Sequence, residues 1–304
     1  MTWFIYAIIG HLANGVAFVI DKALLSTAFK RSATYAGLVG VLSTVVLVAI
    51  PWVPSWPNGF ILLTAIASGA TFIFALHAFF AALARAEASR VVPIVGSLIP
   101  ILTLAGTATF LGERLGMRHI AGFALLILAT AILSSSGGRG RPPRSAVLFG
   151  ILSAVLFAVS TVAGKAVYDA AGFLSGFVTT RIAAAATAVI LLTLADPLAG
   201  REVWGMIRPK DAASKKKSGR AAVLAVFGQS LGAVGFLFVQ LGVAKGSAAI
   251  VNALQAVQYA FLVIVAFALR TRAPHLLKER FDRTATILKI VALFITAAGL
   301  WLVV

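Results

Sequence analysis

The chain has 304 residues, of which 61% are hydrophobic and 12% are charged, and its formal net charge is +17. With a mean hydropathy of +1.02, it has too little polar surface to fold as a soluble globule. The sequence contains no cysteine, which excludes disulfides, thiol chemistry and cysteine-based metal sites. In so apolar a chain we interpret the positive charge as basic loops that fix topology against an anionic leaflet, not as a nucleic-acid surface.

Long apolar runs predict membrane-spanning helices, because a backbone in lipid must satisfy its own hydrogen bonds. The first run begins at Thr2 or Trp3 without a basic n-region or a small-residue cleavage pattern, so we expect a retained span and not a signal peptide. Ten spans are predicted, at residues 2–24, 33–50, 59–82, 90–111, 117–134, 146–168, 173–195, 219–242, 247–269 and 285–304. The expected fold class is an all-α integral membrane protein of ten transmembrane helices.

A run rich in glycine, proline and arginine at 137–145 separates the two apolar halves of the chain. We interpret it as a hinge between two five-helix repeats, 1–136 and 146–304. Aligning the sixth span with the first places Lys165 over Lys22, which supports an internal repeat. Because each repeat has an odd number of spans, the second enters the membrane from the opposite side, and the repeats are predicted to be inverted.

Basic residues are distributed unequally between the predicted loops. The loops after spans one, three, five, seven and nine carry most of them, and the longest, 196–220, is expected to be a solvated loop. The loops after the even-numbered spans carry only Arg114, Arg118 and Lys245. The positive-inside rule therefore predicts cytoplasmic odd-numbered loops, external termini and a multi-pass protein of the cell (inner) membrane.

A proline, a glutamate and a glycine mark the end of the first half. Pro100 lies inside the fourth predicted span, Glu113 closes it, and Gly122 lies early in the fifth. This pattern resembles the end of an EamA domain, the five-helix unit of ten-span members of the drug/metabolite transporter superfamily. The resemblance implies a transporter of two such units covering the whole chain. The second half departs from the pattern at the corresponding positions, which hold Gln258, Thr271 and Lys289.

Polar residues recur at helical spacing along the first span, where His11, Asn14, Asp21 and Lys22 share one face. A polar stripe on a membrane helix turns away from lipid, so it indicates a substrate cavity or a helix contact. For Asp21 and Lys22, snorkelling at the span end is the alternative. Lys22 and its repeat equivalent Lys165 would lie towards opposite membrane faces, as two gating or coupling residues or as two interface anchors.

Arg181 lies about a third of the way into the seventh span. An arginine at this depth costs on the order of 3 kcal/mol even on the gentler insertion scale. Something must therefore compensate the charge. We consider a cluster of carbonyl groups, Asp169 nearby in the sequence, or an anionic group of a substrate.

The ninth span presents Asn252, Gln255 and Tyr259 on one helix face. Such a face is suited to bind a polar solute, and its alternative is hydrogen bonding between helices. Gln229 in the eighth span and His77 in the third are weaker candidates of the same kind, and His77 is equally explained as a buried, hydrogen-bonded histidine.

Two prolines seven residues apart, Pro93 and Pro100, predict a bend in the fourth span. A bend frees backbone carbonyls, which then require polar partners. Interrupted helices often border the binding site of a transporter.

Inverted repeats together with polar residues inside the spans favour a secondary transporter. We expect it to export a small polar metabolite, such as an amino acid or an organic anion, by alternating access. A flippase for a lipid-linked or lipid-like substrate is the alternative. An enzyme is less favoured, because the few acids lie mostly in loops and the four histidines are far apart. We expect no cofactor, no metal and no nucleic acid. The expected partners are the small-molecule substrate and membrane lipid, in a monomer or homodimer.

Overall fold

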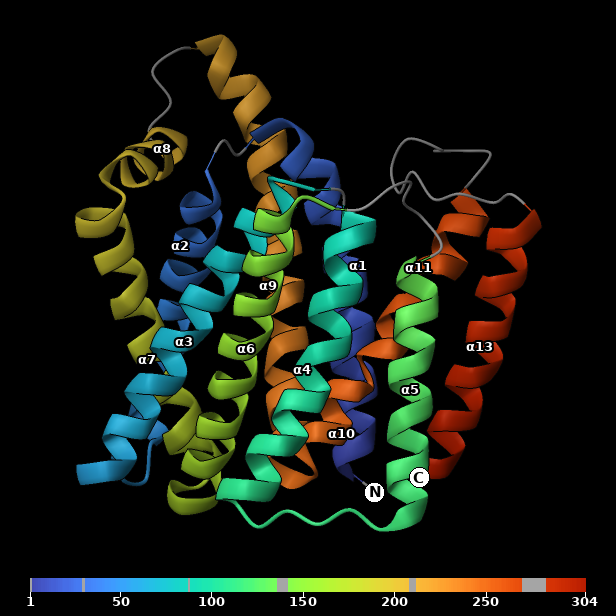
Figure 1. Ribbon diagram of the computed structural model, residues 1–304. Coiled ribbons are helices and arrows are strands. Elements are labelled where there is room, and N and C mark those ends of the chain that lie inside the picture. The colour runs from blue at the N-terminus through green and yellow to red at the C-terminus, as the bar shows by residue number, and fades with distance from the viewer. Residues whose placement is uncertain (1, 29–30, 87, 136–141, 208–211, 270–282) are drawn as a thin grey trace.

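The computed structural model describes residues 2–28, 31–86, 88–135, 142–207, 212–269 and 283–304. Only the backbone is described for 21–28, 88–90, 93, 134–135, 206–207, 212–226 and 269. Every regular element within the described residues is a helix, and the long helices lie side by side in one bundle (Figure 1).

The first half contributes five long helical segments to the bundle. The second segment changes its hydrogen-bond pattern part of the way along, from the α-helix α2 to the 3-10 helix η1. The elements are α1 (Thr2–Ala28), α2 (Ser32–Leu42), η1 (Ser43–Trp52), α3 (Gly59–Leu83), α4 (Ala88–Phe110) and α5 (Met117–Ser135).

The second half contains a similar set of long segments and one additional short helix, α8. Its second segment also ends irregularly, because α7 is continued by a π-helical turn, η2. The elements are α6 (Arg144–Ala171), α7 (Phe173–Ile190), η2 (Leu191–Ala195), α8 (Pro197–Ile207), α9 (Ala212–Lys245), α10 (Ala248–Ala253), α11 (Gln255–Leu269) and α13 (Arg283–Val303).

Eight of the described helical segments are long and apolar enough to cross a membrane. α4 and α5 contain shorter apolar stretches. Large apolar side chains on the surface, such as Phe60, Phe294 and Trp301, are 79%, 73% and 72% exposed. Such a surface is suited to acyl chains and not to water. The prediction of an all-α, multi-pass membrane protein is therefore confirmed.

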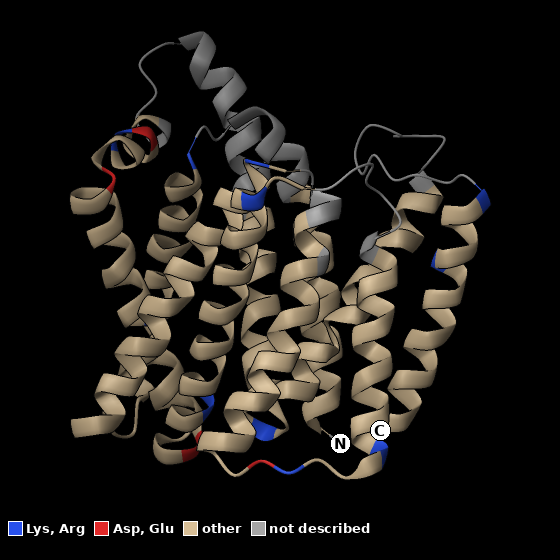
Figure 2. Ribbon diagram, viewed as in Figure 1, with Lys and Arg blue, Asp and Glu red and all other residues tan. Residues whose placement is uncertain are grey.

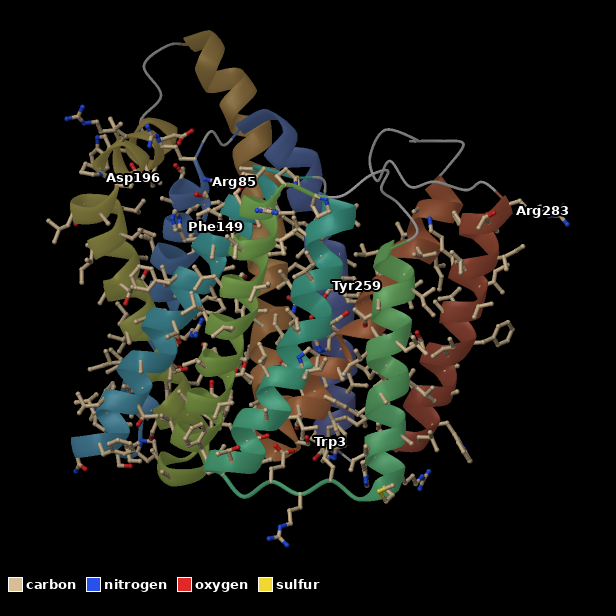
Figure 3. All side chains as sticks on the ribbon, viewed as in Figure 1. Trp3, Arg85, Phe149, Asp196, Tyr259 and Arg283 are labelled. Atoms are coloured by element: carbon tan, nitrogen blue, oxygen red, sulfur yellow. The ribbon has the colours of Figure 1, made fainter. Side chains whose placement is uncertain are left out.

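The helices associate in specific pairs. α1 packs along α9, and α3 packs along α6. α5 packs along α13, and α2 packs beside α7. Both termini lie at one end of the bundle (Figure 1). Arg85 lies at the opposite end (Figure 3), where Figure 2 shows basic residues at the starts and ends of helices.

The prediction of a loop over 196–220 is wrong, because α8 occupies its first part and α9 begins at Ala212. Two features of the sequence explain why α8 forms. The Asp196 carboxylate accepts a hydrogen bond from the Ala199 amide at 3.1 Å and so caps the helix. Ala199 and Val203 are four residues apart and are buried, and α8 packs against α2 and η2. This apolar face holds α8 across the end of the bundle (Figure 1).

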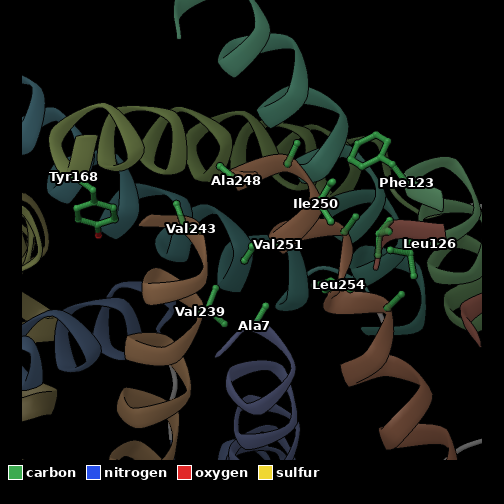
Figure 4. Packing of buried hydrophobic residues seen from close by; sticks show 14 residues of the cluster. Ala7, Phe123, Leu126, Tyr168, Val239, Val243, Ala248, Ile250, Val251 and Leu254 are labelled. Atoms are coloured by element: carbon green, nitrogen blue, oxygen red, sulfur yellow. The ribbon is translucent and has the colours of Figure 1, made fainter. Parts of the chain in front are cut away.

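The ninth predicted span is interrupted at Leu254, where α10 ends and α11 begins. Side chains from neighbouring helices pack around this break, among them Ala7, Leu126 and Val239 (Figure 4). The Ser247 hydroxyl caps α10 by accepting a hydrogen bond from the Ile250 amide at 3.1 Å. An interrupted helix inside a membrane bundle requires polar partners for its backbone.

Candidate functional site

Arg181 is buried within the bundle, where the residue is 6% exposed. It projects from α7 towards two aromatic rings on other helices. Its guanidinium carbon lies 4.4 Å from the ring centroid of Phe72 on α3 and 4.4 Å from that of Phe236 on α9. The quadrupole of each ring attracts the cation. Two helices distant in sequence therefore stabilise the charge through ring faces.

No carboxylate among the described residues forms an ion pair with Arg181. Asp169, which the sequence offered as its partner, instead accepts a hydrogen bond from Lys165 at 2.8 Å, one turn away on α6. The Nε atom of Arg181 is buried without a hydrogen-bond partner. An unsatisfied donor on a buried cation is costly, so an acceptor that binds there would be strongly favoured.

Further aromatic residues pack against the two rings that contact Arg181. The ring centroids of Phe72 and Phe236 are 5.1 Å apart. Phe157 on α6 lies 6.0 Å from Phe72, and Phe177 on α7 lies 6.3 Å from Phe236. We call Phe72, Phe157, Phe177 and Phe236 the aromatic cluster. These separations are typical of interacting rings, so the cluster forms one apolar wall beside a single buried cation.

The aromatic cluster has no signature in the sequence that connects its members. Phe72, Phe157 and Phe236 lie on three different helices, so no local spacing connects them with Arg181. Phe177 lies one helical turn before Arg181 and was the one available signal. Lys289 on α13 was likewise considered only as a departure from the family pattern, although it is only 2% exposed.

A second group of polar residues lies around the break between α10 and α11. The Nε2 atom of His11 donates a hydrogen bond to the Val251 carbonyl at 2.8 Å. Because a carbonyl can only accept, this nitrogen carries the hydrogen. The amide of Asn252 donates to the Thr103 hydroxyl on α4 at 3.0 Å. The structure thus brings together two predicted site residues, His11 and Asn252, through α10.

Two other predicted residues of the ninth span lie on α11. Gln255 and Tyr259 are one helical turn apart and partly exposed. Figure 3 shows Tyr259 within the bundle, and a Cβ atom at Gly96 of α4 would lie 2.8 Å from its hydroxyl oxygen. The small residue at position 96 therefore makes room for the phenol.

Asn14 connects these polar residues to α9. A Cβ atom at Gly235 would collide with the side-chain oxygen of Asn14. The next residue, Phe236, covers the Arg181 guanidinium. Adjacent residues of α9 therefore contact α1 and Arg181, so that one helix touches both polar regions.

Gln229 and His77 both contact residues of α2. Gln229 donates a hydrogen bond to the Tyr35 hydroxyl at 2.9 Å. The Nδ1 atom of His77 lies 3.4 Å from the Ser32 hydroxyl. These bonds join α2 to α9 and α3, and they do not place either residue beside Arg181.

The remaining predicted residues were candidates for gating and bending. Lys165 binds Asp169 and also donates to the Ala244 carbonyl of α9 at 3.3 Å. The side chains of Asp21 and Lys22 lie outside the described part of the chain. α4 continues as one α-helix through Pro93 and Pro100, and the bend predicted there stays a prediction. Among the described residues, no three His, Asp or Glu side chains gather as a metal site.

The comparisons with known proteins bear on the fold alone. No family model and no curated protein matches the sequence. Chains of solved structures do match, and one of them is described as "Crystal structure of protein". It shares 18% sequence identity with this chain, with a TM-score of 0.60 over 96% of this chain and 98% of that one. The same helical fold therefore extends over essentially the whole length of both proteins.

Proposed function

We propose that the protein is a secondary transporter that exports a small polar metabolite, an organic anion or an amino acid, across the cell (inner) membrane. The observation that carries this proposal is Arg181, a buried cation on a membrane helix without a carboxylate partner among the described residues. A charge at that depth costs on the order of 3 kcal/mol. A negatively charged solute would offset this cost, which gives the arginine a function that packing does not.

We further propose that ten spans form two inverted five-helix repeats, as in the EamA units of drug/metabolite transporters. The helix pairings support this arrangement. In this arrangement α1 is the equivalent of α6, and α3 is the equivalent of α9. Exchanging equivalent segments turns the observed pair α1 and α9 into the observed pair α6 and α3. The pair α5 and α13 maps onto itself, as does the pair α2 and α7. Inverted repeats provide two related conformations, which is the basis of alternating access.

The break between α10 and α11 supports the same proposal. Interrupted helices in transporters present free backbone groups near a binding site. Here the interruption lies beside His11, Asn252 and Tyr259, which are partners suited to a polar solute. We assign His11 a positioning role, because its hydrogen bond to Val251 fixes the backbone at the interruption.

Counterflow into proteoliposomes tests the proposed function. Purified protein would be reconstituted with an unlabelled mixture of organic anions and amino acids inside, and uptake of each labelled solute would be measured from outside. We expect at least one solute to accumulate, and Arg181→Met to abolish its accumulation. Arg85→Met is the matched control, because Arg85 also lies 4.4 Å from a phenylalanine ring, that of Phe149, but is exposed at the end of α3.

Two results would contradict this proposal. One is that no solute accumulates while fluorescent lipids are scrambled between leaflets, which would favour a flippase. The other is that Arg181→Met and Arg85→Met transport as well as the unaltered protein. In that case the buried charge would have no part in solute binding.

A further inference from the structure

We propose that the Arg181 site selects monocarboxylates that carry an apolar, preferably aromatic, group, and that it discriminates against zwitterionic amino acids and dianions. This inference rests on the proposed function, in which Arg181 binds the transported solute. It narrows the substrate to one chemical class, and it follows from three features of the described residues around Arg181.

The first feature is the unsatisfied hydrogen bonding of the guanidinium. Its central carbon lies over the ring faces of Phe72 and Phe236, 4.4 Å from each centroid, and these rings offer no hydrogen-bond acceptor of their own. The Nε–H of Arg181 is buried without an acceptor, so a ligand that supplies one would be favoured there. The planar fork of an arginine matches the two oxygens of a carboxylate. A carboxylate is thus the group that completes this site.

The second feature is the charge balance. Arg181 contributes one positive charge, and no carboxylate among the described residues pairs with it. One carboxylate neutralises the site, whereas a dianion leaves an excess negative charge in a region of low dielectric constant. An amino acid brings its ammonium group close to the guanidinium, where the described residues supply no paired carboxylate to compensate it, since Asp169 is paired with Lys165. The balance therefore favours a monoanion without an ammonium group.

The third feature is the aromatic cluster. Its rings follow one another from Phe157 through Phe72 and Phe236 to Phe177, with centroid separations of 6.0, 5.1 and 6.3 Å. An aliphatic chain or a ring beside the carboxylate would pack against these faces, and an additional ring would gain the geometry that aromatic pairs prefer. A polar substrate body would find no hydrogen-bond partner in the cluster itself.

A set of compounds that vary the charge, the ammonium group or the ring tests the inference. Competition with the transported solute would be measured for 3-phenylpropanoate, 3-phenylpropanamide, phenylalanine, phenyl phosphate and propanoate. We expect 3-phenylpropanoate to compete best. The amide lacks the charge, phenylalanine adds an ammonium group, phenyl phosphate doubles the charge, and propanoate lacks the ring. We expect each of these compounds to compete about tenfold or more weakly, since tenfold corresponds to the loss of one modest interaction.

Variants connect the preference to the named residues. Phe72→Leu and Phe236→Leu should reduce the advantage of 3-phenylpropanoate over propanoate several-fold, because leucine keeps an apolar contact but offers no ring face. Arg85→Met should leave this advantage unchanged. Each variant would be checked for folding by size-exclusion chromatography, and the two leucine variants provide a test that leaves the charge in place.

The outcomes separate this inference from the proposed function. If phenylalanine or phenyl phosphate competes as well as 3-phenylpropanoate, or if the leucine variants keep the full aromatic preference, the inference is wrong while transport of a polar metabolite stands. If no solute of any class accumulates in counterflow, the proposed function itself fails. If 3-phenylpropanoate competes best and loses its advantage in the leucine variants, both are supported.

Discussion

Phe236 of α9 covers the guanidinium of Arg181 on α7, with 4.4 Å between the ring centroid and the guanidinium carbon. This contact joins two helices that are otherwise only lightly packed against each other, and it places an aromatic ring where a membrane protein more often places a carboxylate. The stability of the bundle and its function should therefore depend on Arg181 in opposite ways.

We predict that Arg181→Met stabilises the fold while it abolishes transport. The substitution removes a buried charge that costs on the order of 3 kcal/mol and loses two cation–π contacts worth about 0.5–1 kcal/mol each. The net gain is about 1–2 kcal/mol, which thermal unfolding in detergent would register as a higher Tm. Such opposition of stability and activity is common at binding sites.

Arg85→Met is the control for that measurement. Arg85 is exposed, donates to the Ala81 carbonyl at 2.7 Å and lies over the Phe149 ring. Its removal should leave the Tm unchanged or slightly lower. A lower Tm for Arg181→Met than for Arg85→Met would show that Arg181 already has a favourable environment without a ligand.

We predict that His11→Phe destabilises the protein and that His11→Gln does so less. The Val251 carbonyl beside the helix break accepts the hydrogen bond from His11 Nε2, and a buried carbonyl without a donor costs about 1–3 kcal/mol. Glutamine can supply a replacement N–H group. Thermal unfolding of the two variants checks this order, and equal Tm values would mean that the carbonyl finds another donor.

Much of the fold follows from the sequence, because apolar runs of sufficient length have few alternatives in a bilayer. The predicted spans correspond closely to the observed helices. α8 was missed because the charges of its region outweighed the spacing of Ala199 and Val203. The break at Leu254 contains neither proline nor glycine, so nothing local marks it. It depends on packing from other helices.

The candidate site could be predicted only in part. Arg181 was identifiable from its depth in a span, and His11 and Asn252 from their polarity. The partners could not be identified, because the rings of Phe72 and Phe236 reach Arg181 through tertiary packing. Asp169 was a reasonable partner by sequence proximity, but Lys165 lies one turn away on the same helix and binds it.

We predict that Gly69→Ala destabilises the bundle by about 1–3 kcal/mol. A Cβ atom at Gly69 of α3 would meet the Thr180 carbonyl of α7 and lie 2.6 Å from the Ala184 amide nitrogen, and backbone atoms cannot move aside as a side chain can. Gly205→Ala on α8 is the control, since no atom lies within 4 Å of its added Cβ. That change should be neutral or stabilising, because alanine favours helix. Comparison of the two Tm values tests the close crossing of α3 and α7.

Single cysteines test whether α4 and α5 cross the membrane, because the sequence contains no natural thiol. Arg85, Arg114 and Arg144 are exposed and flank these two helices in order. We predict that a membrane-impermeant maleimide labels Arg114→Cys in intact cells, and that it labels Arg85→Cys and Arg144→Cys only after permeabilisation. This pattern follows from external termini and from two helices that each span the bilayer.

The alternative patterns are informative in different ways. Labelling of Arg85→Cys and Arg144→Cys alone in intact cells would reverse the orientation and leave the ten spans intact. Labelling of Arg114→Cys together with one of its neighbours from one side would mean that the helix between them does not cross. Within the described residues, only α4 lies between positions 85 and 114, and only α5 lies between 114 and 144. If one of the two does not cross, the first repeat has an even number of spans, and the inverted arrangement on which alternating access depends would no longer be possible.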